Sequence, residues 1–213
     1  MFEHHATLKK HFGALRTTAE FFSLRYVRES GQYLSVRKNV AEPPHLGHDE
    51  GAMLTVRLNG VEAYAATNDI SLAGLQAALE RAVQQARLIK PHALLDLHQQ
   101  PVSSDVADYL SPDLDQPFPS LSDCYQLLGD ESAAVPKDER LVSWEVSLGT
   151  TRVEQIYLNS AGAQLRQAQR FVFPGLSVTA FDGNDSQTRT LGGTNFGQQG
   201  SAGVIQRFGL VGA

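Results

Sequence analysis

The stretch from Glu50 to Arg87 constrains the fold of this chain most strongly, because it specifies both a β-hairpin and the helix that covers it. Apolar and polar residues alternate from Met53 to Leu58 and from Val61 to Ala65, on either side of Asn59-Gly60. Asn-Gly accepts the positive φ values of a type I′ turn, and such a two-residue turn fixes the strand register. The predicted cross-strand pairs are Leu58 with Val61, Val56 with Ala63, and Arg57 with Glu62.

A helix is predicted directly after this hairpin, with Ser71 as its N-cap residue. Its apolar residues recur at helical spacing and form one stripe, which consists of Leu72, Leu75, Leu79, Val83 and Ala86. One face of the helix is therefore expected to cover the apolar face of the hairpin.

The residues before this hairpin predict a short helix and a further hairpin. The helix is expected from His4 to Leu15, and alternation with period two then runs from Phe22 to Val36. A three-residue loop, Glu29-Ser30-Gly31, would place Tyr26 opposite Leu34. Residues 1–90 are thus expected to form an α+β N-terminal domain of two β-hairpins packed with helices.

A proline-rich connector is predicted over residues 91–138. Only Ser120 to Leu128 has helical spacing there, with either Ser120 or Ser122 as the cap. The lone cysteine, Cys124, lies in this helix without a nearby His or cluster of positive charge, so a structural thiol is favoured over a nucleophile.

An antiparallel β-meander is predicted over residues 139–191. Strands are expected at Val142–Leu148, Val153–Leu158, Leu165–Phe173 and Leu176–Phe181. The turns between and after them are expected at Gly149-Thr150, Asn159–Gly162, Pro174-Gly175 and Asp182–Asp185. Residues 192–213 are predicted to be a Gly-rich tail.

Composition excludes several classes of protein. The formal charge is −5, from 18 Lys and Arg against 23 Asp and Glu, so the positive surface of a nucleic-acid-binding protein is not expected. A single cysteine excludes an intrachain disulfide framework, and neither a long apolar run nor a secretion signal is visible. The sequence therefore predicts a cytoplasmic chain that binds neither nucleic acid nor membrane.

The best sequence candidates for a metal site are His45 and His48, followed by Asp49 and Glu50. These side-chain types suit zinc or nickel, but structural zinc needs four positioned ligands and this segment is predicted to be an irregular loop. No residue is therefore assigned a catalytic, cofactor-binding or metal-binding role.

The order of these features resembles the N-terminal portion of the TldD/PmbA family. The resemblance rests on the strand, Asn-Gly turn and short strand ending in ATND, on the helix that ends in Ala-Arg, and on YLNSAGAQL and TAFDGNDSQT further along the chain. Members of this family, also described as modulators of DNA gyrase, are two-domain zinc metalloproteases or their metal-free partner subunits. The resemblance implies a homodimer, or a heterodimer with a family paralogue, and a peptide or unfolded protein as substrate.

The zinc-binding motif of the family enzymes is absent from this sequence. Their catalytic helix carries an H-E-x-x-x-H type motif, whereas no histidine follows His98 here and no His-Glu pair occurs. Zinc is therefore implied only for a C-terminal part that this chain lacks. The apolar tail at residues 204–213 favours the same interpretation, because exposed apolar ends are unusual.

Two functional hypotheses follow. In the first, the chain is the non-catalytic, substrate-facing and dimer-forming N-terminal part of a zinc metallopeptidase that processes peptides. In the second, it is a stand-alone, metal-free scaffold or partner subunit that binds extended peptides along a strand edge without cleaving them. An in-frame zinc motif downstream of Ala213 would favour the first, and a stop codon there the second.

Overall fold

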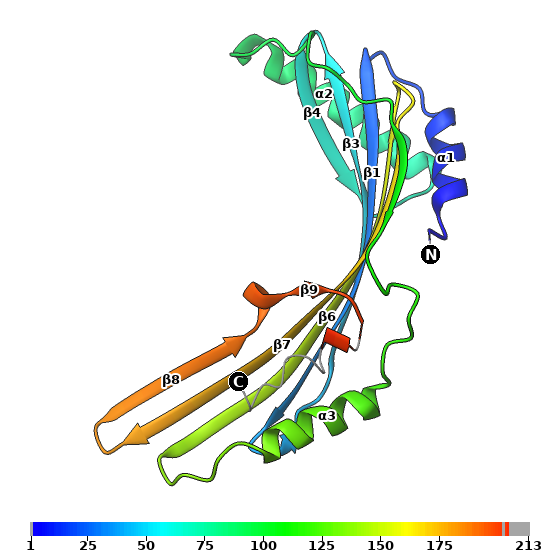
Figure 1. Cartoon of the computed structure of the whole chain (residues 1–213). Helices are drawn as coiled ribbons and strands as arrows, with labels where there is room; N and C mark the ends of the chain where they lie inside the picture. The colour runs from blue at the N-terminus through cyan, green and yellow to red at the C-terminus, as the bar shows by residue number, and fades with distance from the viewer. Residues whose placement is uncertain (1, 202, 205–213) are drawn as a thin grey trace. The chain divides into compact units, whose positions relative to one another are not determined.

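The computed structural model describes residues 2–201 and 203–204, and it confirms an α+β fold built on a large β-sheet (Figure 1). Of the predicted tail at residues 192–213, positions 202 and 205–213 lie outside the described residues. No helix within the described ranges combines the length and the hydropathy needed to cross a membrane.

The helices are α1 (His5–Ala14), α2 (Leu72–Ile89) and α3 (Leu121–Ala133), with short 3₁₀ turns η1 (Lys90–His92) and η2 (Thr194–Phe196). The strands are β1 (Phe21–Arg37), β2 (Val40–Ala41), β3 (His45–Leu58), β4 (Val61–Thr67), β5 (Val106–Leu110), β6 (Leu141–Asn159), β7 (Gln164–Asp182), β8 (Asp185–Gly192) and β9 (Gln198–Gln199).

The strands that the structure describes are hydrogen-bonded in the order β4-β3-β1-β6-β7-β5, with β2 beside β1 and with β8 and β9 beside β7. The pairs β1–β2, β3–β4, β7–β8 and β7–β9 are antiparallel. Strand β5 is different. The Gln164 amide donates to the Asp105 carbonyl and Arg166 pairs with Asp108, so the contacts advance in the same direction along β7 and β5. This order of contacts indicates a parallel pair.

The residues group into two compact units, each assembled from three chain segments. The first unit comprises Met1–Glu29, Asp49–Tyr109 and Val153–Ala168, and the second comprises Ser30–His48, Leu110–Arg152 and Gln169–Ala213. Strands β1, β3, β6 and β7 contribute residues to both units. The division into domains at residues 1–90, 91–138, 139–191 and 192–213 follows chain order and stays a prediction.

The hairpin around Asn59-Gly60 forms as the sequence predicts. Strands β3 and β4 pair with Leu58 opposite Val61, Arg57 opposite Glu62 and Val56 opposite Ala63. Both turn residues have positive φ, 53° at Asn59 and 75° at Gly60, as a type I′ turn requires. The predicted register is confirmed.

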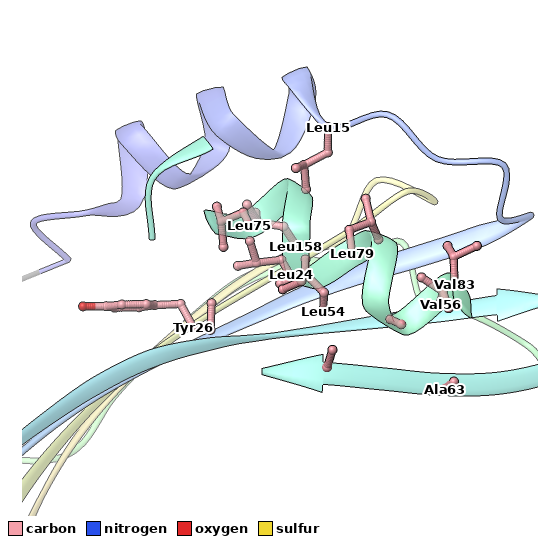
Figure 2. Close-up of a cluster of buried hydrophobic side chains, with 14 of the residues drawn as sticks. Leu15, Leu24, Tyr26, Leu54, Val56, Ala63, Leu75, Leu79, Val83 and Leu158 are labelled. Atoms are coloured by element: carbon pink, nitrogen blue, oxygen red, sulfur yellow. The ribbon is translucent and has the colours of Figure 1, made fainter. Parts of the chain in front are cut away.

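Helix α2 covers one face of this hairpin and forms the core of the first unit with it (Figure 2). The Ser71 hydroxyl accepts a hydrogen bond from the Gly74 amide, which confirms the predicted N-cap. Leu75, Leu79, Val83 and Ala86 are buried as expected, together with Ala78 and Ala82. Leu72 is 39% exposed, so its assignment to the buried stripe was wrong. Helix α1 adds Leu8 to the same core.

Three turns predicted at glycines are absent, because each glycine lies inside a long strand. Strand β1 passes through Gly31, β6 through Gly149 and β7 through Gly175. A β-carbon on Gly31 would lie 3.2 Å from the Thr150 carbonyl oxygen, and one on Gly175 would lie 2.8 Å from Ser147 Oγ. These glycines therefore permit close approach to a neighbouring strand rather than a change of chain direction.

The first hairpin forms at a different place from the predicted one. Strand β1 turns at Lys38-Asn39, where φ is 50° and 65°, and pairs with β2 through Val36 and Ala41. The predicted pairing of Tyr26 with Leu34 was therefore wrong, since both residues lie on the same strand.

In the second unit, α3 packs on the sheet through a core that includes Cys124, Leu128, Val146 and Leu148. The structure resolves the choice of helix cap. The Ser120 hydroxyl accepts from the Asp123 amide, and the Asp123 carboxylate accepts in turn from the Ser120 amide, which forms a capping box.

Replacing Ser120 with alanine is expected to lower the free energy of unfolding by about 1 kcal/mol, because a first-turn amide of α3 loses its acceptor. Ser122→Ala is the matched control, since Ser122 is exposed in the same turn and does not cap the helix. Urea denaturation followed by circular dichroism measures both. An equal loss in the two variants would contradict the assigned cap.

Four described strands were not predicted: the two-residue strands β2 and β9 and the longer strands β5 and β8. Strand β5 interrupts the connector that was expected to contain only a helix, and all five of its residues are exposed. Strand β8 pairs with β7 across the turn at Asp182–Asp185, which was itself predicted correctly. Its sequence, DSQTRTLG, lacks the apolar alternation by which strands are recognised.

Candidate functional site

The histidine-containing segment at His45 to Glu50 is part of strand β3 and not the irregular loop that was predicted. His45 and His48 are both exposed, and positions three apart along an extended strand point to opposite faces. Within residues 2–201 and 203–204, no group of three or more His, Cys, Asp or Glu side chains could hold a metal ion. His45 and His48 therefore do not face a common metal ion.

Cys124 is poorly placed for nucleophilic chemistry. Its side chain is 2% exposed and its Sγ lies 3.8 Å from the Pro119 carbonyl oxygen. Burial, and secondarily the nearby Asp123 carboxylate, raises the pKa of the thiol. Because the thiolate is the reactive form, this environment suits a structural cysteine.

The most distinctive feature of the first unit is an open groove on the sheet face opposite α2. Side chains alternate between the two faces of a strand, so Leu24 and Leu54 lie in the core under α2 while Val27 and Met53 line the groove. The groove has a volume of about 650 Å³. Its walls come from three strands and the segment after β4: Arg25, Val27 and Glu29 of β1, Asp49 to Met53 of β3, and Ala66 to Asn68.

Carboxylates dominate the charge of this groove. Glu29 and Asp49 are exposed, and no hydrogen bond or ion pair of either carboxylate is found in the described part of the chain. Glu50 is engaged: it accepts a 2.6 Å hydrogen bond from the Tyr26 hydroxyl and lies 3.7 Å from His4 Nε2. Burial raises the pKa of Tyr26, and the hydrogen bond to Glu50 raises it further, so this phenol stays protonated as a donor.

Among the described residues that line the groove, the one Lys or Arg side chain is Arg25, and it is held toward β6. Arg25 donates through Nε and Nη2 to Gln155 Oε1 at 3.3 and 3.0 Å. The guanidinium is therefore paired with a neutral amide. The Glu50 side chain lies on the same strand face as the buried Ala52 and Leu54, so Glu29 and Asp49 are the carboxylates on the groove face. Among the described lining residues, these two carboxylates face one guanidinium, which leaves a local excess of negative charge.

The edge of the sheet beside this groove is strand β4. Because Leu58 and Val61 flank a two-residue turn, they form a hydrogen-bonded pair, and the peptide groups of Glu62 and Tyr64 point away from β3. Neither peptide group has a hydrogen-bond partner among the described residues. The next outward carbonyl, that of Ala66, accepts from Arg81 Nη2 at 3.0 Å. An unpaired strand edge of this kind can pair with an extended peptide.

The tip of the β3–β4 hairpin is fixed by the residues that follow α2. The Leu97 amide donates to the Gly60 carbonyl at 2.9 Å, and Lys90 Nζ donates to the Asn59 carbonyl at 2.6 Å. On the other side, Glu20 accepts from the Asn59 amide at 3.0 Å. The β4 edge is thus supported at its turn end.

A further hollow lies within the second unit. It has a volume of about 570 Å³ and is lined mainly by apolar groups, including the rings of Tyr33 and Phe173 and the glycines Gly31 and Gly149. The Tyr33 hydroxyl donates to Glu145, which also pairs with Arg37. The described residues that line this hollow include no Asp, Glu, Lys or Arg, in contrast to the groove of the first unit.

The sequence assigned no residue to a site, and the reason for missing the groove is specific. The predicted turn at Glu29-Ser30-Gly31 would have reversed the chain where β1 in fact continues. The alternation of Arg25, Val27 and Glu29 along one face was the signal available in the sequence, although it does not show which strands lie beside β1.

Comparison with known proteins supports a family relationship. Residues 22–86 match the family model described as PmbA/TldA metallopeptidase domain 1. No curated protein matches the chain.

Solved structures with a similar fold extend the likeness beyond these residues. A putative modulator of DNA gyrase from Bacteroides thetaiotaomicron superposes with a TM-score of 0.68 at 13% identity over 95% of this chain and 47% of its own. A second putative modulator of DNA gyrase, from Thermotoga maritima, gives 0.53 at 12% identity over 80% of this chain and 38% of its own. TldE from Thermococcus kodakarensis superposes with a TM-score of 0.59 at 15% identity, over 95% of this chain and 45% of its own. The chain therefore spans less than half the length of each of these structures.

Proposed function

We propose, on the premise that residues 22–86 form a first domain of the PmbA/TldD family, that this chain binds extended peptides without cleaving them. In this proposal it is the substrate-facing and dimerisation part of a TldD/PmbA-like zinc metallopeptidase involved in peptide processing. Hydrolysis would belong to residues outside this sequence.

The observation that carries the proposal is the unpaired edge of β4 beside an open groove. An extended peptide that adds to such an edge gains main-chain hydrogen bonds with little dependence on its sequence, and nearby hollows then select its side chains. Binding of this kind suits a protein that receives unfolded chains.

The donor groups of the sequence support the proposal that this chain carries no hydrolytic centre of its own. Zinc peptidases with a helical His-Glu motif use imidazoles to hold the metal and a glutamate that takes a proton from the metal-bound water. This sequence contains no His-Glu pair, and its last histidine is His98. No step of peptide cleavage is therefore assigned to its residues.

The purified chain is expected to contain no stoichiometric zinc, to cleave no peptide, and to bind an unstructured fluorescent peptide with saturation. Metal analysis, a peptide-hydrolysis assay and fluorescence anisotropy measure these three properties. The control is the same peptide with alternate backbone nitrogens methylated, which keeps the side chains and removes the donors for strand pairing. One zinc per chain with cleavage would overturn the non-catalytic role, and equal binding of the methylated peptide would overturn the edge mechanism.

The alternative is a stand-alone metal-free scaffold or partner subunit that binds extended peptides without cleaving them. It makes the same prediction for this chain in isolation. The coding sequence downstream of Ala213 separates the two hypotheses: an in-frame H-E-x-x-x-H motif supports the metallopeptidase, and a stop codon supports the scaffold.

A further inference from the structure

We infer that the groove of the first unit accepts a lysine or arginine side chain of an extended peptide. The inference rests on the proposed function, because it concerns which peptides the chain binds.

The groove offers apolar surface for the aliphatic part of such a side chain. Val27 and Met53 are both partly buried on the open face, and Ala66 lies on the adjacent edge strand. Lysine and arginine bury their methylene stems on apolar surface while the charged group stays in water. A long basic side chain therefore matches both the apolar walls and the open, solvated form of the groove.

The charge of the groove favours a cation. Glu29 and Asp49 line it from neighbouring strands and bring two carboxylates that no other described group pairs. Arg25 donates to Gln155, and no ion pair between Arg25 and either carboxylate is found in the described part of the chain. An acidic peptide side chain would meet like charge, whereas a basic one would form one or two solvent-exposed ion pairs.

The position of the groove links it to the β4 edge. Pairing of β3 with β4 ends at Ala52 and Thr67, and the groove is lined by Asp49 to Met53 on one side of this point and by Ala66 to Asn68 on the other. A peptide that adds to the β4 edge would therefore run toward the groove, and its side chains could enter from there.

The experiment compares three unstructured peptides that differ only in a central residue: lysine, norleucine or glutamate. The lysine peptide is expected to bind the full chain about fivefold more tightly than the norleucine peptide, as two exposed ion pairs of modest strength would give. The glutamate peptide is expected to bind more weakly than either. The preference for lysine should decrease as salt is added, because exposed charges are screened.

The matched variants are Glu29→Gln with Asp49→Asn in the groove, and Glu139→Gln with Asp182→Asn as a control with the same change of net charge. All four residues are exposed, and circular dichroism checks that each variant folds. The double variant in the groove should bind the lysine and norleucine peptides equally, while the control double variant should keep the preference for lysine.

The outcomes separate this inference from the proposed function. Equal affinity of the parent chain for lysine and norleucine peptides would overturn the inference and leave peptide binding intact. If the double variant in the groove still preferred the lysine peptide, the assignment of this preference to Glu29 and Asp49 would be wrong. The same holds if the groove variant and the control variant both lost the preference. No binding of any peptide would overturn the proposed function itself.

Discussion

Leu79→Ala is expected to lower the free energy of unfolding by about 3 kcal/mol, the largest effect among the substitutions considered for this chain. Leu79 is fully buried at the centre of α2, in the cluster that joins the helix to β1, β3, β4 and β6. Removing its side chain loses apolar contacts and leaves a cavity that close-packed neighbours fill only in part.

The control for this substitution is Leu72→Ala, at the first residue of the same helix. Leu72 is 39% exposed, so its truncation is expected to cost less than about 1 kcal/mol. Thermal and urea denaturation of both variants give the difference. If the two losses were equal, the position of α2 on the sheet would have to be revised.

Gly60→Val is expected to destabilise the chain by about 2 kcal/mol for two reasons. Gly60 has φ of 75°, a conformation that β-branched residues strongly resist. A β-carbon there would also lie 2.6 Å from His98 Nδ1 and collide with the Asp96 carboxylate. The substitution therefore strains the turn and displaces the segment that supports the hairpin tip.

Gly183→Val separates these two contributions, because Gly183 has φ of 62° and open space where the side chain would lie. Its cost is expected to reflect backbone strain alone and to be smaller than that of Gly60→Val. Chemical denaturation measures both free energies. Unchanged stability of Gly60→Val would contradict the type I′ turn at Asn59-Gly60.

The sequence predicted those parts of the fold that a few neighbouring residues determine by themselves. Asn59-Gly60 specifies one turn type, and Ser71 with the apolar spacing after it specifies a capped helix, whatever surrounds them. Gly31, Gly149 and Gly175 differ because a glycine in an apolar segment indicates either a turn or a close approach between strands. The choice depends on Thr150, Phe173 and Ser147, which lie far from them in sequence.

The candidate groove was beyond sequence reasoning for a related reason. Val27, Met53 and Ala66 each follow from strand alternation, but their common location depends on which strands are neighbours. That order came only from the structure. The exposed edge of β4 was closer to prediction, since the hairpin register already determines which peptide groups point outward.

The burial of Cys124 makes the exterior of this protein suitable for labelling at a chosen position. It is the only cysteine in the sequence, and its side chain is almost completely enclosed on the face of α3 that packs on the sheet. A cysteine introduced at the exposed Ala66 would therefore be the single sulfur that a maleimide dye reaches under native conditions. Such a dye would report the arrival of a peptide beside the β4 edge through its own emission.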